Sequence, residues 1–453
     1  DMTIKTLTIS DTVNGLGLDA DGYALTIAPA SAAAGITMSA GVPASTIGSN
    51  VVLGADQTWT NNSASALTVS GTISGAFGLT KNGTGEIILS GGANSYSGDT
   101  RINAGTLNLA NRYAAQGSTV IMGGGSASLV FDSSATANAF TLGGLSAAGS
   151  GAGYDIALQN NAATPAGITL TVGGNNASTS YAGVLSGAGG LTKTGTGTLE
   201  LYGANAYDGT TSVNAGTLYL SGSNSGSGGT VIAGGVLQLT SVNPLASGPL
   251  ALNGSAIKAY GAARSLANAV SWGGNFTIGG TKDLALTSSN TVTTGARTIA
   301  INNTGDTTTS TPLAYSGNCT FNFGNSSGDL TVISEVTLTG GNRTFTVNAT
   351  GTSGSLVFTS GVGQDGSNRT LTKAGNGTLV LDGSCTYAGS TTINGGILEV
   401  PGSVELSDMT VNTAGAMIAG GGLVKSLNVK ADTGFVWGFG DGQDHTLDVL
   451  TTL

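Results

Sequence analysis

His445 is the only histidine among 453 residues, and it lies in the string GFGDGQDHTLDV. Most hydrolytic triads use histidine as the general base, so a single copy offers little from which to build one. The string GNSSG at 324–328 has the spacing of a nucleophile elbow, but no helical pattern follows it. A chain rich in Gly and Ser produces such strings by chance, so the sequence predicts no catalytic residue and no enzyme.

Carboxylates could also bind metals or act on glycans. Asp441, Asp444 and Asp448 lie among glycines, which suits either a calcium loop or an ordinary polar turn, and we favour the turn. The 24 acidic residues are thinly spaced, whereas glycan lyases and hydrolases cluster theirs on one wall. We therefore predict no metal site and no cofactor. Isolated pairs are expected to be solvated corner charges, namely Asp365 with Arg369 and Lys282 with Asp283.

Aromatic and sulfur side chains are the remaining groups that could bind a ligand or react. A row of exposed rings would favour glycan binding. The three tryptophans are widely separated, however, and three recurring tyrosines fit a corner-packing role better; they are Trp59, Trp272 and Trp437, and Tyr96, Tyr207 and Tyr387. The two cysteines, Cys319 and Cys385, are 66 residues apart, and we expect free, buried thiols.

A unit of about thirty residues recurs three times and contains the three recurring tyrosines. It reads LTKNGTGEIILSGGANSYSGDTRINAGTLNL from Leu79, LTKTGTGTLELYGANAYDGTTSVNAGTLYL from Leu191 and LTKAGNGTLVLDGSCTYAGSTTINGGILEV from Leu371. Apolar and polar residues alternate, which indicates half-buried strands. The repeat units lie near 79–109, 191–220 and 371–400.

Each unit contains two similar strands, and this spacing predicts the fold. Leu199 precedes Leu218 by nineteen residues, as Leu379 precedes Leu398, while Ile87 and Leu107 are twenty apart. A chain that returns to the same lateral position every roughly 19 to 23 residues is a β-solenoid of stacked parallel strands. We predict one continuous all-β solenoid over 1–453, a right-handed parallel β-helix with about 20 rungs.

Composition agrees with this fold. The 77 glycines suit tight corners, and alternation along most of the chain argues against disorder. Three glycine- or threonine-rich stretches look like insertions, at 147–153, 221–229 and 304–311.

Charge and hydropathy restrict the partners. The formal net charge of −10, with no basic patch, argues against nucleic acid. The sequence contains no apolar run of about 18 residues, the length that a membrane-spanning helix needs. The start DMTIKTLTIS lacks the pattern of a secretory signal, which suggests a processed segment or a fragment.

The thirty-residue unit resembles the passenger-associated transport repeat of bacterial autotransporter passengers, also called the autotransporter-associated β-strand repeat. The second copy follows the family pattern almost throughout, including Lys193, Gly195, Tyr207 and Gly216; the third departs at Ser384-Cys385 and at Gly395. This resemblance implies a β-helix exported to the bacterial cell surface, in which the repeat assists export and folding.

We therefore expect a non-catalytic extracellular β-solenoid that acts as a surface stalk, an adhesin shaft or a filament assembled end to end from copies of itself. Open strand edges at the ends of a solenoid favour such assembly. Surface glycans, host cells or matrix are further candidate partners. The alternatives are a glycan-active lyase or hydrolase, or a glycan-binding module, on the same scaffold.

Overall fold

The computed structural model describes residues 1–30, 33–151, 153–241, 244–292, 295–310, 313–351 and 353–430. Apart from a short 3-10 helix, Thr136–Asn138, every element in these ranges is a strand. The named strands pair in parallel, and the chain forms a right-handed parallel β-helix of about 19 turns. The predicted fold class is therefore confirmed. The chain divides into two compact units, Asp1–Leu237 with Asn243–Gly248, and Gln238–Val242 with Pro249–Leu453.

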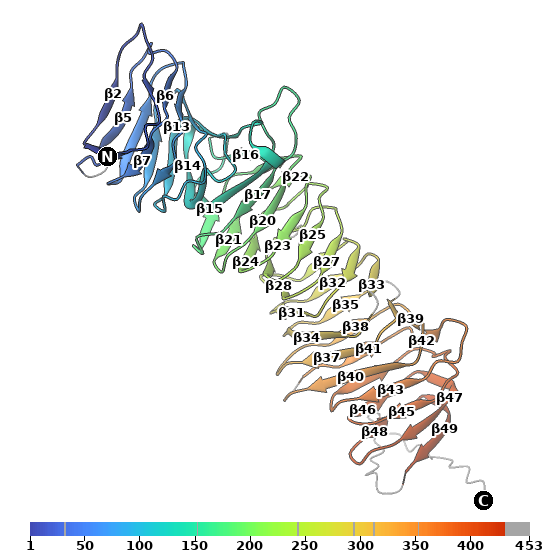
Figure 1. Cartoon of the computed structure of the whole chain (residues 1–453). Helices are drawn as coiled ribbons and strands as arrows, with labels where there is room; N and C mark the ends of the chain where they lie inside the picture. Colours follow the sequence, from blue (N-terminus) through green and yellow to red (C-terminus); the bar gives the residue numbers. More distant parts are fainter. Residues whose placement is uncertain are drawn as a thin grey trace, which may run out of the picture. The chain divides into compact units, whose positions relative to one another are not determined.

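The first coils of the first unit have three walls, each a stack of parallel strands (Figure 1). One wall contains β1 (Met2–Ile4), β4 (Ala24–Ile27), β7 (Asn50–Leu53) and β10 (Ile73–Ser74). The second contains β2 (Leu7–Ile9), β5 (Ala34–Met38), β8 (Gln57–Asn61) and β11 (Leu79–Asn82). The third contains β3 (Gly17–Leu18), β6 (Ser45–Ile47), β9 (Leu67–Val69) and β12 (Glu86–Leu89). Both β11 and β12 then pair with the long β13 (Thr100–Leu109).

The remaining coils of the first unit continue the pattern after the long strands β14 (Ala115–Phe131) and β15 (Ala139–Ala147). One wall contains β17 (Thr169–Val172), β20 (Gly190–Lys193), β23 (Thr211–Val213) and β25 (Thr230–Ile232). Another contains β18 (Thr179–Tyr181), β21 (Thr198–Leu201) and β24 (Thr217–Leu220), and the third contains β16 (Ile156–Ala157), β19 (Leu185–Gly187) and β22 (Ala206–Tyr207). Strand β26 (Val236–Leu239) lies at the boundary of the units in sequence.

The second unit is built in the same way, with three walls, and the third wall consists of two short sheets that meet at β33 and β36. One long wall contains β28 (Ala256–Ala259), β31 (Phe276–Gly280), β34 (Arg297–Asn303), β37 (Cys319–Phe323), β40 (Arg343–Ala349), β43 (Leu371–Ala374), β45 (Thr391–Ile393), β47 (Ser403–Val411) and β49 (Leu423–Val429). The other contains β29 (Arg264–Leu266), β32 (Leu284–Leu286), β35 (Thr307–Thr309), β38 (Leu330–Val332), β41 (Leu356–Phe358), β44 (Thr378–Leu381), β46 (Ile397–Glu399) and β48 (Met417–Ala419). The first of these short sheets contains β27 (Leu250–Leu252), β30 (Val270–Trp272) and β33 (Asn290–Val292), and the second contains β36 (Leu313–Tyr315), β39 (Val336–Leu338) and β42 (Val362–Gln364).

The register predicted from spacing is confirmed in all three repeats. Leu199 is the Cα partner of Leu218, Leu379 of Leu398, and Ile87 of Leu107. These leucines and isoleucines are buried because alternate side chains of a strand point into the coil. Successive turns therefore stack like residue on like residue, and an apolar column fills the interior of each unit.

Two of the three predicted insertions are wrong. The stretch 304–311 supplies β35, in which Thr307 and Thr309 are fully buried, and 221–229 lies within a turn of ordinary length, since Thr211 pairs with Thr230. Threonine fills core positions here because its β-branched side chain suits a packed wall even where its hydroxyl is buried. The insertion at 147–153 is supported, because Ala139 pairs with Thr169, thirty residues later.

Candidate functional site

The third residue of each repeat is a lysine that lies inside the β-helix. Lys81 is on β11, Lys193 on β20 and Lys373 on β43, and their side chains are 0%, 1% and 0% exposed. In register, Lys81 lies between Trp59 and Ile102, both fully buried. An apolar column thus contains a charged side chain at one point in each repeat, which requires compensation nearby.

Backbone carbonyls supply that compensation, and we call each arrangement a lysine–carbonyl nest. In every nest the ammonium group donates to the next two carbonyl oxygens along its own chain and to a third oxygen on the following turn. The Nζ–O distances are 2.9 Å from Lys81 to Asn82, Gly83 and Ala104; 3.0 and 3.4 Å from Lys193 to Gly195 and Ala215, with Thr194 as its third acceptor; and 2.9, 3.0 and 3.0 Å from Lys373 to Ala374, Gly375 and Gly395.

Burial changes the acid–base behaviour of these amines. Desolvation lowers the pKa of Lys81 and of Lys373 to about 8, and it lowers the pKa of Lys193 as well. With a pKa of about 8, Lys81 and Lys373 are still largely protonated at neutral pH, and the three N–H bonds of an ammonium group match three acceptors. Each nest therefore links two successive turns through one positive charge.

Glycines create the space for the nest. Gly105 and Gly216 have φ values of 66° and 61°, a region that L-residues with a side chain rarely adopt. A Cβ atom at either position would lie 2.8 Å from the nested Nζ and 2.4 Å from a backbone oxygen. Gly105 and Gly216 are therefore required for two reasons: the turn has a positive φ, and the lysine Nζ and a backbone oxygen leave no room for a Cβ atom.

The recurring tyrosines are buried, which confirms their corner-packing role. Tyr96, Tyr207 and Tyr387 are at most 8% exposed, and each hydroxyl pairs with the threonine four residues later, at 2.6–2.8 Å. Desolvation raises the pKa of Tyr96 and of Tyr207 to about 12. None of the three rings is available to stack on a sugar.

The other sequence candidates are not brought together into a site. Trp59 and Trp272 are fully buried, and Cys319 and Cys385 are free, buried thiols as predicted, whose pKa values burial raises to about 12 and about 11. His445, Trp437, Asp441, Asp444 and Asp448 lie outside the described residues.

The remaining candidates are surface features. The string at 324–328 leads into strand β38 rather than a helix, so it is not a nucleophile elbow. Asp365 and Arg369 form an i,i+4 ion pair at 2.7 Å between Nε and Oδ1. Asp283 is exposed and accepts a hydrogen bond from the backbone N–H of Asp306 at 3.0 Å. Neither pair belongs to a larger cluster of charged groups among the described residues, as expected of solvated corner charges.

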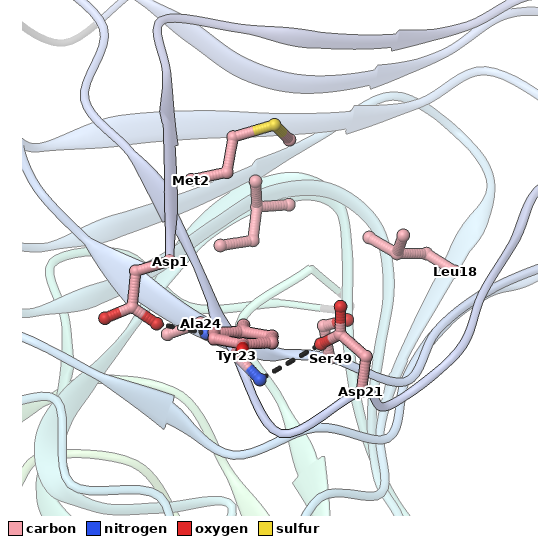
Figure 2. A pocket seen from close by; sticks show the side chains of 8 residues that line it. Asp1, Met2, Leu18, Asp21, Tyr23, Ala24 and Ser49 are labelled. Carbon is pink, nitrogen blue, oxygen red and sulfur yellow. Dashed lines mark hydrogen bonds between the residues drawn. The ribbon is translucent and has the colours of Figure 1, made fainter.

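A hollow lies on the first coils of the β-helix. Figure 2 shows its lining, which includes Asp1, Tyr23 and Asp21. The carboxylate of Asp1 accepts the backbone N–H of Ala24 at 2.8 Å, and that of Asp21 accepts the N–H of Tyr23 at 3.0 Å. Both carboxylates thus serve the local backbone, and the hollow presents no set of groups with an evident chemical task.

Comparisons with known proteins agree with the repeat geometry. The family profile described as the passenger-associated transport repeat matches residues 79–109, 191–219, 215–239 and 371–400. The chain carries passenger-associated transport repeats. The fourth match, 215–239, overlaps the end of the second repeat and contains no lysine.

One relative is an autotransporter of Brucella suis biovar 1, named Adhesin BmaC autotransporter. It is 38% identical over 151 residues, a segment that covers 33% of this chain and only 4% of that protein. No solved structure matches the chain significantly. Both matches support the expected location, outside the cell or at the bacterial cell surface. Within the described ranges, no helix is long and apolar enough to cross a membrane.

Proposed function

We propose that this chain is a non-catalytic shaft segment of a bacterial surface adhesin. The proposal rests on one observation. The lysine, glycine and tyrosine of each repeat all bind or pack within the β-helix. Side chains that serve the scaffold in this way are what a stalk requires, since adjacent turns stabilise one another.

The relative supports this role in two ways. It is named an adhesin, and the matched segment is a small part of a much longer protein, as expected for a module repeated along a shaft. In this proposal, adhesive contact belongs to other parts of the parent protein, while this segment extends the reach of that contact from the cell surface.

Surface display tests the proposal. The chain is fused between a translocator and an epitope tag, and bacteria carrying it are compared with bacteria carrying the tag alone. We expect the tag to become accessible to large antibody conjugates, with no gain in adhesion to host cells or matrix. Strong adhesion by the segment itself would contradict the shaft role and indicate an adhesive surface. Release of reducing sugars from a polysaccharide panel would instead indicate a glycan-active enzyme.

End-to-end self-association is a finer version of the same proposal. It is motivated by the strand edges that any β-solenoid presents at its ends. Electron microscopy and light scattering of the purified chain test it, because long uniform fibres support assembly and single particles of monomer mass contradict it.

A further inference from the structure

One turn of the second unit, formed by β34, β35 and β36, has threonine where the neighbouring turns have apolar side chains; we call it the polar turn. Thr307 and Thr309, on β35, are fully buried. Their register partners on the preceding and following turns are all buried and apolar, namely Leu284, Leu286, Leu330 and Val332. A threonine buries less apolar surface than a leucine, so the polar turn gains less from the hydrophobic effect than the turns on either side.

Four buried side-chain atoms of the polar turn have no hydrogen-bond partner among the described residues. They are Thr307 Oγ1, Thr309 Oγ1, Asn303 Oδ1 on β34 and the hydroxyl oxygen of Tyr315 on β36. All four side chains are fully buried. Buried polar groups are normally paired within the protein, and a turn that leaves several of them unpaired is less stable than one that pairs them.

The repeats contain the same residue types and bring them together. Tyr207 pairs with Thr211, and Tyr387 pairs with Thr391, each at 2.6 Å between the two hydroxyl oxygens. In the polar turn the tyrosine follows Thr307 by eight residues instead of preceding it by four, and its hydroxyl reaches neither threonine. A buried threonine is thus compatible with a well-paired β-helix, and the polar turn differs because its hydroxyls lack such a partner.

The backbone ladder is also interrupted at the polar turn. Strand β36 pairs with β39 on the following turn, but within the described ranges it pairs with no strand of the preceding turn, although β33 lies next to it. The other two walls continue on both sides, through β34 and β35. The polar turn is therefore joined to the following turn by three ladders and to the preceding turn by two.

We propose that the second unit opens first at the polar turn. Three separate observations meet there: reduced apolar burial, unpaired buried polar atoms and a missing ladder. Local opening begins where few apolar contacts and few backbone hydrogen bonds oppose it. Because each turn of a solenoid contacts only its neighbours, the turns on either side keep their structure when this one opens. The polar turn thus gives the β-helix a fixed place at which to yield under load or heat.

Hydrogen exchange of the purified chain, read by mass spectrometry at neutral pH, tests the proposal. After correction for intrinsic exchange rates, we expect the amides of β35 and β36 to exchange at least about tenfold faster than those of β38 and β39, which occupy the same walls on the following turn. The measurement uses the isolated chain, so its outcome does not depend on the result of surface display.

A double variant separates the effect of the hydroxyls from that of the ladder. Thr307→Val combined with Thr309→Val keeps the shape of both side chains and removes two unpaired hydroxyls, so exchange in β35 and β36 should slow at least about fivefold and Tm should rise. Thr308→Val is the matched control, because Thr308 lies between them on the same strand and faces outward, half-buried. It should change the exchange of these strands by less than about twofold.

Three outcomes would overturn the proposal. Equal exchange rates in β35–β36 and β38–β39 would show that the polar turn is not the first to open. Unchanged or faster exchange in the double variant would show that the buried hydroxyls do not weaken the turn. An equal slowing by Thr308→Val would attribute the effect to the preference of valine for strands and not to removal of the unpaired hydroxyls.

Discussion

The repeats and the segment between the second and third of them bury cations in different ways. In the repeats, a lysine within a strand donates to carbonyls of two successive turns. In the intervening segment, Arg343 is the first residue of β40, is 8% exposed, and donates to the carbonyl oxygens of Tyr315, Asn342 and Thr339. Arg264, the first residue of β29, donates to the carbonyls of Ala263, Tyr260 and Thr240.

The difference shows which feature is general and which belongs to the repeat. A β-helix corner gathers carbonyl oxygens that the strand ladders leave unpaired, and a buried cation satisfies several of them at once. Either side chain can do this. The compact ammonium group lies where glycines let two turns approach closely, whereas the longer guanidinium group extends from the first residue of a strand to carbonyls at the preceding corner.

The largest effect is expected from a buried charge that has no carbonyl nest. Leu199 is 1% exposed and lies six residues after Lys193 in the same repeat. Leu199→Asp would bury a carboxylate against Leu218, its register partner, and should lower the free energy of unfolding by about 4 kcal/mol or more. Thermal or urea unfolding measures this, and an unchanged Tm would contradict the assignment of Leu199 and Leu218 to adjacent turns.

Removal of a nested charge should have the next largest effect. Lys81→Met removes the side-chain donor from three buried carbonyl oxygens, and we expect a loss of about 3 kcal/mol in the free energy of unfolding. Urea unfolding followed by tryptophan fluorescence measures this loss, and Trp59, the register partner of Lys81, contributes to the signal together with Trp272 and Trp437. The exposed Lys5 provides the control, because Lys5→Met should change stability by less than about 0.5 kcal/mol. Equal effects of the two substitutions would mean that the nest does not stabilise the fold.

The glycines should matter less than the charge but more than an ordinary turn residue. Gly105→Ala combines a positive φ with a Cβ atom 2.8 Å from Lys81 Nζ, and should cost about 1–3 kcal/mol. At Gly92 the nearest atom to an added Cβ is Thr72 Cγ2 at 3.7 Å, so Gly92→Ala should be neutral within about 0.5 kcal/mol. Matching unfolding curves for the two variants would show that the close approach at Gly105 is unimportant.

The smallest effect expected is a dependence on pH that distinguishes lysine from arginine. In the unfolded chain Lys81 keeps its proton up to its ordinary pKa of 10.5, whereas burial lowers the pKa in the folded state to about 8. Between these values the unfolded state binds more protons, so the contribution of Lys81 to stability rises with pH. The difference in unfolding free energy between the wild-type chain and Lys81→Met should therefore grow from pH 8 to pH 9.5.

Arginine provides the matched comparison for this pH effect. The guanidinium group of Arg343 remains protonated throughout that range, so the difference between the wild-type chain and Arg343→Met should be flat. The range stops at pH 9.5 because buried tyrosines, such as Tyr96 with its raised pKa, reduce stability above about pH 10. A flat profile for Lys81 as well would indicate that its pKa is not lowered in the folded chain.

The sequence by itself determined the β-helix and its register. Alternating apolar residues fix which face of each strand is buried, and the nineteen-residue interval between Leu199 and Leu218 fixes which residues stack, because a shift of one residue would turn the apolar face outward. It also determined that Tyr207 packs at a corner, since positions far apart along the solenoid cannot form one sugar-binding surface.

Only the tertiary structure decided where the polar side chains lie. Lysine is ordinarily exposed, and no sequence pattern showed that the carbonyls of Gly83 and Ala104, on successive turns, would meet around Lys81. The convergence of Glu86 and Asp132 on Asn108 likewise spans three turns. Local patterning specifies strands because each residue feels its own neighbours, whereas such clusters arise only when residues about twenty positions apart are stacked on one another.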